Sequence, residues 1–200
     1  MGKEKIDKKL IREIEITLLV AIIALMAFTP IGYFKTAGVE ITLITIPVIV
    51  GSVLLGRRVG AILGLVFGAT SFIQAFSGLS AFGLACFTIN PLLCFLMCVP
   101  TRVLMGYLTG LIFEKAKDKS INNILAGLVG SLLNTVLFVS VFMLSYWNSE
   151  YVTVLKEYFG TTGVFTFIIA FVGINGLIEA VVNTIISGTL ITALSKLNIE

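Results

Sequence analysis

The chain has 200 residues, of which 58% are apolar and only 12% are charged, and its mean hydropathy is +1.07. A soluble globular chain is usually about 25% charged, so a buried core does not explain this apolar excess. Histidine is absent and the three cysteines form no paired CxxC motif, which argues against a zinc site, a disulfide framework and histidine-based catalysis. The net charge of +3 is too small to indicate nucleic-acid binding. We therefore expect residues 1–200 to form one integral membrane domain.

Six apolar segments follow a charged stretch at residues 1–12, which we interpret as a cytoplasmic tail. Turn-forming residues separate the segments, and most have about the 20 residues that a membrane-spanning helix needs. The second is short and contains Pro47, and the last is long enough to extend past the bilayer. The predicted fold is thus an all-α bundle of six transmembrane helices. The expected spans are 13–30, 41–56, 59–77, 90–113, 121–146 and 162–194, with outer loops near 31–40, 78–89 and 147–161.

Basic residues predict the orientation of the bundle. With the N-terminus inside, eleven of the 14 basic residues fall on the cytoplasmic side, and only Lys35 and Lys156 fall in outer loops. Cytoplasmic loops carry the excess of lysine and arginine in membrane proteins, so both termini are expected to be cytoplasmic. The eleven are Lys3, Lys5, Lys8, Lys9, Arg12, Arg57, Arg58, Lys115, Lys117, Lys119 and Lys196.

Small residues recur at helical spacing within the spans. Gly60, Gly64 and Gly68 repeat every four residues in the third span, and Gly106 and Gly110 do so in the fourth. Such spacing lets helices approach closely in lipid, where apolar side chains gain little by leaving their solvent. The pattern predicts contacts between helices of this chain. The alternative is that one such face, on the first span, docks another membrane protein.

Polar side chains inside the spans mark the candidate site. Arg102 lies near the middle of the fourth span, where an arginine costs about 2.5–3.5 kcal/mol on insertion scales, so it should face the interior of the bundle. Glu179 lies near the middle of the sixth span, and its spacing of four from Asn175 and Asn183 places all three on one helix face. The further candidates are Gln74, Asn134 and Trp147.

Two interpretations of these residues stay open at this point. In one, Arg102 and Glu179 form a structural ion pair and the asparagines bridge helices. In the other, Arg102 binds the anionic group of a ligand while Asn134, Asn175 and Gln74 bind hydroxyl or amide groups. The two can combine, because a guanidinium group paired with one carboxylate still has donors free. Trp147 fits either an interfacial aromatic belt or a ligand-stacking role.

Several catalytic motifs are absent from the sequence. It contains no GxxxxGK[ST] phosphate-binding loop, no HExxH zinc motif and no GxSxG nucleophile motif followed by a histidine. We therefore expect no enzyme activity, no cofactor and no metal ion in this chain. It is also too short for the common secondary transporters built from two repeated bundles. These features favour a substrate-capturing subunit of a larger assembly.

At this point the sequence resembles a family of membrane proteins. Residues 45–68, with the pattern Leu-Leu-Gly-x-x-x-Gly-Ala-x-x-Gly from Leu54 to Gly64, resemble the second and third helices of substrate-binding (S) components of energy-coupling factor (ECF) vitamin transporters. Residues 90–110, with Val-Pro-Thr-Arg ending at Arg102, are similar to the pantothenate-type subgroup. The resemblance covers nearly the whole chain.

This resemblance implies a six-helix protein of the prokaryotic plasma membrane with an outward-facing vitamin site that the first outer loop covers. It also implies partnership with a transmembrane coupling subunit (EcfT-like) and two ATPase subunits, and a toppling motion during substrate delivery. The first helix of the family usually carries an Ala-x-x-x-Ala docking motif. Here Ala21, Ala24 and Ala27 take its place at a spacing of three.

Pantothenate fits the predicted site residues. It has a carboxylate for Arg102, and hydroxyl and amide groups for Asn134 and Asn175. Hydroxymethylpyrimidine or a pyridoxine-like vitamin is the alternative, in which Glu179 binds an amino group or a ring nitrogen. Two other classes remain as hypotheses: a membrane scaffold without a ligand, and a membrane enzyme that uses Glu179 as an acid or base.

Overall fold

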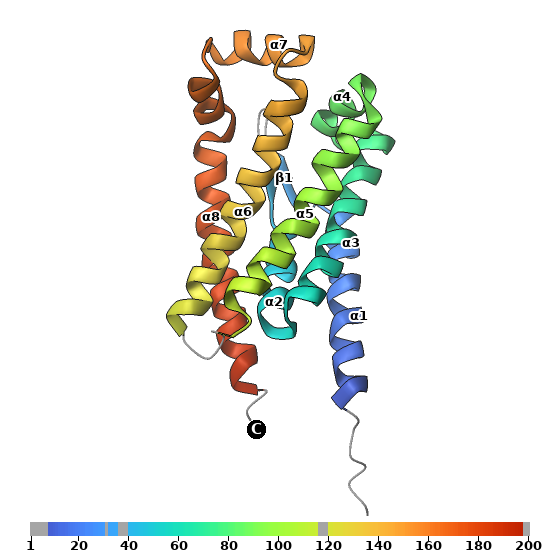
Figure 1. Ribbon diagram of the computed structural model, residues 1–200, viewed down its shortest axis with the longest axis vertical. Helices are drawn as coiled ribbons and strands as arrows, with labels where there is room; N and C mark the ends of the chain where they lie inside the picture. Colours follow the sequence, from blue (N-terminus) through green and yellow to red (C-terminus); the bar gives the residue numbers. More distant parts are fainter. Residues whose placement is uncertain (1–7, 31, 36–39, 116–119, 198–200) are drawn as a thin grey trace, which may run out of the picture.

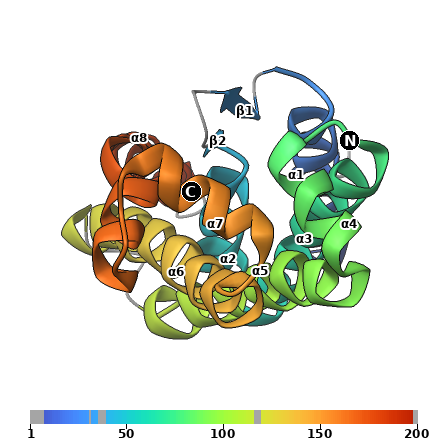
Figure 2. The ribbon, with the colours of Figure 1, turned by 90° about the horizontal axis from the view of Figure 1, so that it is seen from above.

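The computed structural model describes residues 8–30, 32–35, 40–115 and 120–197. They form an elongated bundle of helices with one short hairpin beside it (Figures 1 and 2). The elements, in chain order, are α1 (Lys8–Ala27), β1 (Tyr33–Lys35), β2 (Glu40–Thr42), α2 (Thr45–Leu55), α3 (Arg57–Ser77), α4 (Ala81–Ile89), α5 (Pro91–Phe113), α6 (Ser120–Tyr146), α7 (Glu150–Phe159) and α8 (Val164–Leu197).

Four of the described helices are long and apolar enough to cross a membrane: α3, α5, the Ile121–Tyr146 part of α6 and the Gly176–Lys196 part of α8. α7 and the start of α8 are together long and apolar enough to cross a membrane, but the two helices meet at an angle of 75°. Counted as one broken span, they raise the number of candidate spans to five at most in the described part of the chain. The prediction of six spans is therefore matched only in part. The 11 residues of α2 are few for a span, and charged residues occupy the first half of α1.

Each of the three predicted outer loops contains regular structure. In the first, β1 and β2 pair antiparallel, with Tyr33 opposite Thr42. The second contains α4, and the third contains α7, which lies across one end of the bundle (Figure 1). Both helices begin at a serine: the Ser80 hydroxyl oxygen accepts the Gly83 N–H at 3.1 Å, and Ser149 caps α7 in the same way. Short capped helices of this kind are not visible in a search for long apolar runs.

The last predicted span, 162–194, is not one continuous helix. Gly173 interrupts α8 with φ +40° and ψ −141°, a conformation that residues with a Cβ rarely adopt. The break separates Val164–Val172 from the long apolar segment Gly176–Lys196. Both parts are apolar, so hydropathy alone merged them into one long span.

The glycines of α3 bring its backbone against that of α5. A Cβ on Gly60 would collide with the backbone of Gly106, and a Cβ on Gly64 would collide with the backbone carbonyl of Arg102. This confirms that the glycine spacing marks a contact within the chain. Because the two backbones touch at Gly64, α3 fixes the position from which the Arg102 side chain projects.

Charged side chains hold the end of the bundle where α1 begins and α8 ends (Figure 1). The Arg12 guanidinium donates to the Leu55 carbonyl at 3.0 Å, which ties α1 to the end of α2. The Glu114 carboxylate accepts the backbone N–H of Arg57 at 2.8 Å, which ties the end of α5 to the start of α3. The direction of this end in the membrane stays a prediction.

The contact between α3 and α5 can be tested at two neighbouring residues. Gly64 is buried against α5, whereas Leu65 is 50% exposed on the outside of the bundle. We expect Gly64→Val to lower the free energy of unfolding by about 2 kcal/mol, because its methyl groups would push the two backbones apart. Leu65→Val should change it by less than about 0.5 kcal/mol. Thermal unfolding of the purified protein in detergent measures both, and an equal loss of stability in the two variants would contradict the close contact.

Candidate functional site

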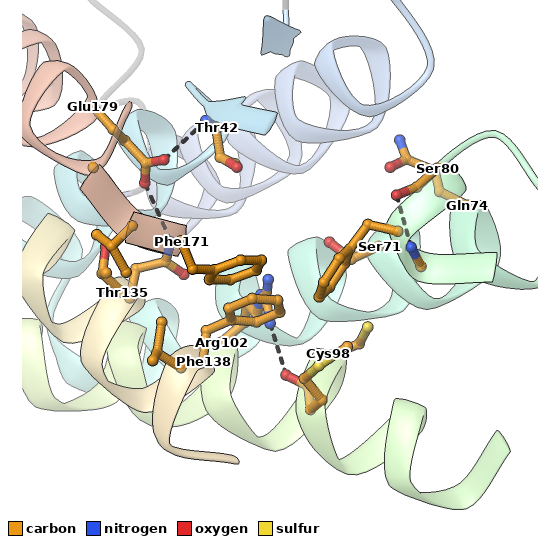
Figure 3. Close-up of a pocket in the computed structure, with 17 residues that line it drawn as sticks. Thr42, Ser71, Gln74, Ser80, Cys98, Arg102, Thr135, Phe138, Phe171 and Glu179 are labelled. Atoms are coloured by element: carbon orange, nitrogen blue, oxygen red, sulfur yellow. Dashed lines mark hydrogen bonds between the residues drawn. The ribbon is translucent and has the colours of Figure 1, made fainter. Parts of the chain in front are cut away.

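A cavity of about 130 Å³ lies inside the bundle (Figure 3). Its walls come from α3, α5, α6 and α8, with β2 and α4 closing it. Apolar surface, including that of three phenylalanine side chains, makes up most of the lining, as in most small-molecule sites. The polar lining residues are Thr42, Ser71, Gln74, Ser80, Arg102, Asn134, Thr135 and Glu179.

Four of the six predicted site residues line this cavity: Gln74, Arg102, Asn134 and Glu179. They come from four different helices, so only the folded bundle brings them together. Trp147 lies outside the cavity lining. Its ring centroid is 3.5 Å from the Lys156 ammonium nitrogen, at the turn that leads into α7. The remaining prediction, Asn175, concerns a side chain outside the described part of the chain.

Arg102 is held mainly by α5 itself and by aromatic rings. Its side chain is 8% exposed, and its Nη1 donates to the Met97 carbonyl at 2.7 Å and to the Thr101 hydroxyl at 3.1 Å. The guanidinium carbon lies 4.6 Å from the ring centroid of Phe138 and 5.3 Å from that of Phe67. Such cation–π contacts offset part of the cost of desolvating the charge. Nε is buried without a hydrogen-bond partner in the described part of the chain.

The Glu179 carboxylate is not paired with Arg102. Its Oε2 accepts the backbone N–H of Thr42 at 3.1 Å, and its Oε1 accepts a hydrogen bond from Asn134 Nδ2 at 3.4 Å. The ion pairs found among the described residues lie elsewhere, near the ends of α1 and α3. The interpretation of Arg102 and Glu179 as a direct structural ion pair is therefore wrong. In Figure 3 the guanidinium and the carboxylate occupy separate parts of the cavity.

The polar face predicted on the last helix attaches that helix to the hairpin and α2. Asn183 is fully buried, and its Nδ2 donates to the Thr45 hydroxyl at 2.7 Å and to the Thr42 carbonyl at 3.4 Å. Glu179 binds the N–H of the same threonine. Both backbone groups of Thr42 are thus bound by side chains of α8, so the hairpin and α8 form one wall of the cavity.

The Gln74 side chain in the cavity wall has a partner at the end of α1. Gln74 donates from its side-chain amide to the backbone carbonyl of Ala27, the last residue of α1. Ala27 is itself buried, whereas Ala21 is exposed. The predicted docking alanines of α1 therefore do not share one accessible face.

Aromatic residues form the part of the site that sequence reasoning missed. Phe82, Phe138 and Phe171 line the cavity, and Phe82 packs against Phe171 with ring centroids 5.7 Å apart. Phenylalanines in an apolar span look alike in sequence whether they face lipid or a ligand. One signal was available, since Phe138 follows Asn134 by four residues and so lies on the same helix face.

This arrangement suits one class of ligand. The guanidinium group offers unpartnered donors, and Asn134 Oδ1 is a buried acceptor without a partner in the described residues. Buried polar atoms left unpartnered are costly, and a ligand that supplies the missing partners removes that cost. The cavity can thus hold a small molecule with an anionic group and a hydroxyl or amide group.

Comparison with known proteins adds independent evidence. The model of the family described as "ECF transporter, substrate-specific component" matches residues 9–191, which include every residue that lines the cavity. Over 167 residues the chain is 29% identical to the pantothenic acid transporter PanT of Lactococcus lactis subsp. cremoris (strain MG1363), with 79% of each chain covered. Together with its apolar helices, these matches support a multi-pass membrane protein with a transport role. The chain belongs to the family of substrate-specific components of ECF transporters.

Proposed function

We propose that this chain captures pantothenate from outside a prokaryotic cell and delivers it across the plasma membrane with partner subunits. The partners in this proposal are a transmembrane coupling subunit and two ATPase subunits, as membership of the ECF family implies. The family match supports the transport role, and the relative named as a pantothenic acid transporter supports the substrate. In this proposal α1 and α2 complete six membrane segments, both termini are cytoplasmic, and α1 carries the docking face at Ala21 and Ala24.

The observation that carries the substrate assignment is the state of Arg102. This arginine lines the cavity, and in the described part of the chain it forms no ion pair. A guanidinium group has five N–H donors, and the described hydrogen bonds use only those of Nη1. The other donors match the two oxygens of a carboxylate, which arginine binds bidentately. The carboxylate of pantothenate would supply the missing partner of a buried cation.

The other end of the ligand lies between Asn134 and Glu179 in this proposal. Asn134 Oδ1 accepts a hydroxyl hydrogen of the ligand while its Nδ2 stays bonded to Glu179. A hydroxymethylpyrimidine or a pyridoxine-like vitamin would use Glu179 instead, but it would leave the Arg102 donors unpartnered. A scaffold role accounts for neither the cavity nor these donors.

Arg102→Met tests the carboxylate site. Methionine keeps an unbranched apolar stem and removes the charge and the donors, so we expect the affinity for labelled pantothenate to fall about 100-fold or more. Arg102→Lys should bind with intermediate affinity, because lysine keeps the charge but not the bidentate geometry. The affinity for D-panthenol, in which a hydroxymethyl group replaces the carboxylate, should change little in either variant.

The binding measurements need a folded protein and competing vitamins as controls. Size-exclusion chromatography and thermal unfolding identify variants that fold. A folded Arg102→Met variant that binds pantothenate with wild-type affinity would remove the assignment. Displacement of pantothenate from the wild type by a small excess of hydroxymethylpyrimidine or pyridoxine would favour the alternative substrates.

Asn134→Leu tests the other end of the ligand. We expect it to weaken pantothenate binding about tenfold or more, because a ligand hydroxyl loses its acceptor. Thr135→Val is the matched control on the next residue of the same cavity wall. Its hydroxyl donates to the Ser131 carbonyl at 3.2 Å, so its loss should change the affinity by less than about threefold. Equal losses in both variants, measured by equilibrium binding, would contradict a specific role for Asn134.

A further inference from the structure

Two phenylalanine rings cover the guanidinium group of Arg102. Phe138 on α6 and Phe67 on α3 lie with their ring centroids 4.6 Å and 5.3 Å from the guanidinium carbon. Both helices pack against α5, and they lie on different sides of it (Figure 1). The rings therefore approach Arg102 from two directions and restrict the routes by which a ligand can reach it.

The hydrogen bonds of Arg102 restrict the approach further. Nη1 donates to the Met97 carbonyl and to the Thr101 hydroxyl. Nε is buried and unpartnered, and no hydrogen bond joins Nη2 to any described residue. Nε–H and one of the two N–H groups of Nη2 share one edge of the guanidinium plane and point in the same direction. Arg102 thus presents one pair of parallel donors, at its Nε–Nη2 edge, that no described hydrogen bond uses.

From this geometry we infer that Phe138 is a specificity-determining residue. Together with Phe67 it confines the anionic group of the ligand to the guanidinium plane, at the Nε–Nη2 edge. The site therefore selects a planar carboxylate over a tetrahedral sulfonate or phosphate. This inference rests on the proposed function, because it concerns the same cavity and the same anionic group.

The selection follows from the shape and charge distribution of the anion. Both oxygens of a carboxylate can lie in the guanidinium plane, and none lies outside it. A sulfonate or phosphate that presents two oxygens to the same edge places at least one other oxygen out of the plane. That oxygen would face the ring of Phe138 or Phe67, and the face of an aromatic ring carries negative charge density. Repulsion and crowding by the ring would weaken binding of the tetrahedral anion.

The chain offers a matched pair of phenylalanines for the test. Phe138 is half-buried and lines the cavity, so its replacement leaves the fully buried Phe67 in place. Phe171 lines the same cavity from α8, and its ring stacks on Phe142 with centroids 5.3 Å apart. Phe171→Leu removes about as much apolar surface from the cavity as Phe138→Leu does. It leaves both rings that contact the guanidinium group, those of Phe67 and Phe138, in place.

The experiment compares two ligands on the purified full-length chain. Pantothenate and N-pantoyltaurine, its analogue with a sulfonate in place of the carboxylate, are titrated into the wild type and three variants. We expect the wild type to bind pantothenate about 30-fold more tightly than the sulfonate. In Phe138→Leu this ratio should fall about tenfold. Phe138→Tyr keeps the aromatic face and should restore the ratio, and Phe171→Leu should weaken both ligands while leaving the ratio unchanged.

The outcomes separate this inference from the proposed function. A wild type that does not bind pantothenate overturns the proposed function and the inference with it. A wild type that binds pantothenate but discriminates less than about threefold overturns only the inference, whether or not the variants fold. The inference also fails if Phe138→Leu keeps the wild-type ratio, or if Phe171→Leu lowers the ratio as much as Phe138→Leu does.

Discussion

The burial of one guanidinium group among apolar helices is the constraint on which the rest of the structure depends. A charge in this environment is costly unless it is paired or hydrogen-bonded. The chain offsets part of that cost with two bonds from Nη1 and two aromatic rings, and the described residues leave the Nε–Nη2 edge without a partner. The close contact at Gly64 is part of the same arrangement. It brings α3 near enough to α5 for Phe67, on the next turn, to reach the charge of Arg102.

Because Arg102 and Glu179 are not paired, the cavity has a basic group in one part and an acidic group in another. A direct ion pair between them would neutralise the guanidinium charge and occupy part of its donors. Instead Glu179 holds Thr42 and Asn134, and Asn183 holds the other backbone group of Thr42. The carboxylate thus organises the wall made by the hairpin and α8, while the guanidinium group stays available to an anion. One acidic and one basic side chain, each costly in lipid, take different tasks in the same cavity.

The features predicted correctly from the sequence are those in which a residue type by itself carries a large energetic consequence. Gly64 predicts close helix contact because a missing side chain is what permits it, and Arg102 predicts an interior site because lipid does not solvate it. The break at Gly173 and the place of Phe138 in the cavity wall were missed, because both lie in uniformly apolar sequence where hydropathy does not distinguish a kink from a helix or a cavity wall from a lipid face. Trp147 was assigned to the site from its chemistry alone, and its distance from the cavity depends on the path of α7.

The cavity lies between two walls that the chain joins in different ways. Arg102 belongs to the pair α3–α5, whose backbones touch. The opposite wall comes from β2 and from α8 on both sides of the break at Gly173, and polar side chains rather than close backbone contact join these elements. Asn134 on α6 bonds to Glu179 of this opposite wall, so a ligand held by Arg102 and by Asn134, as proposed above, would connect the two walls. Its binding would stabilise the folded arrangement of the cavity in proportion to its affinity.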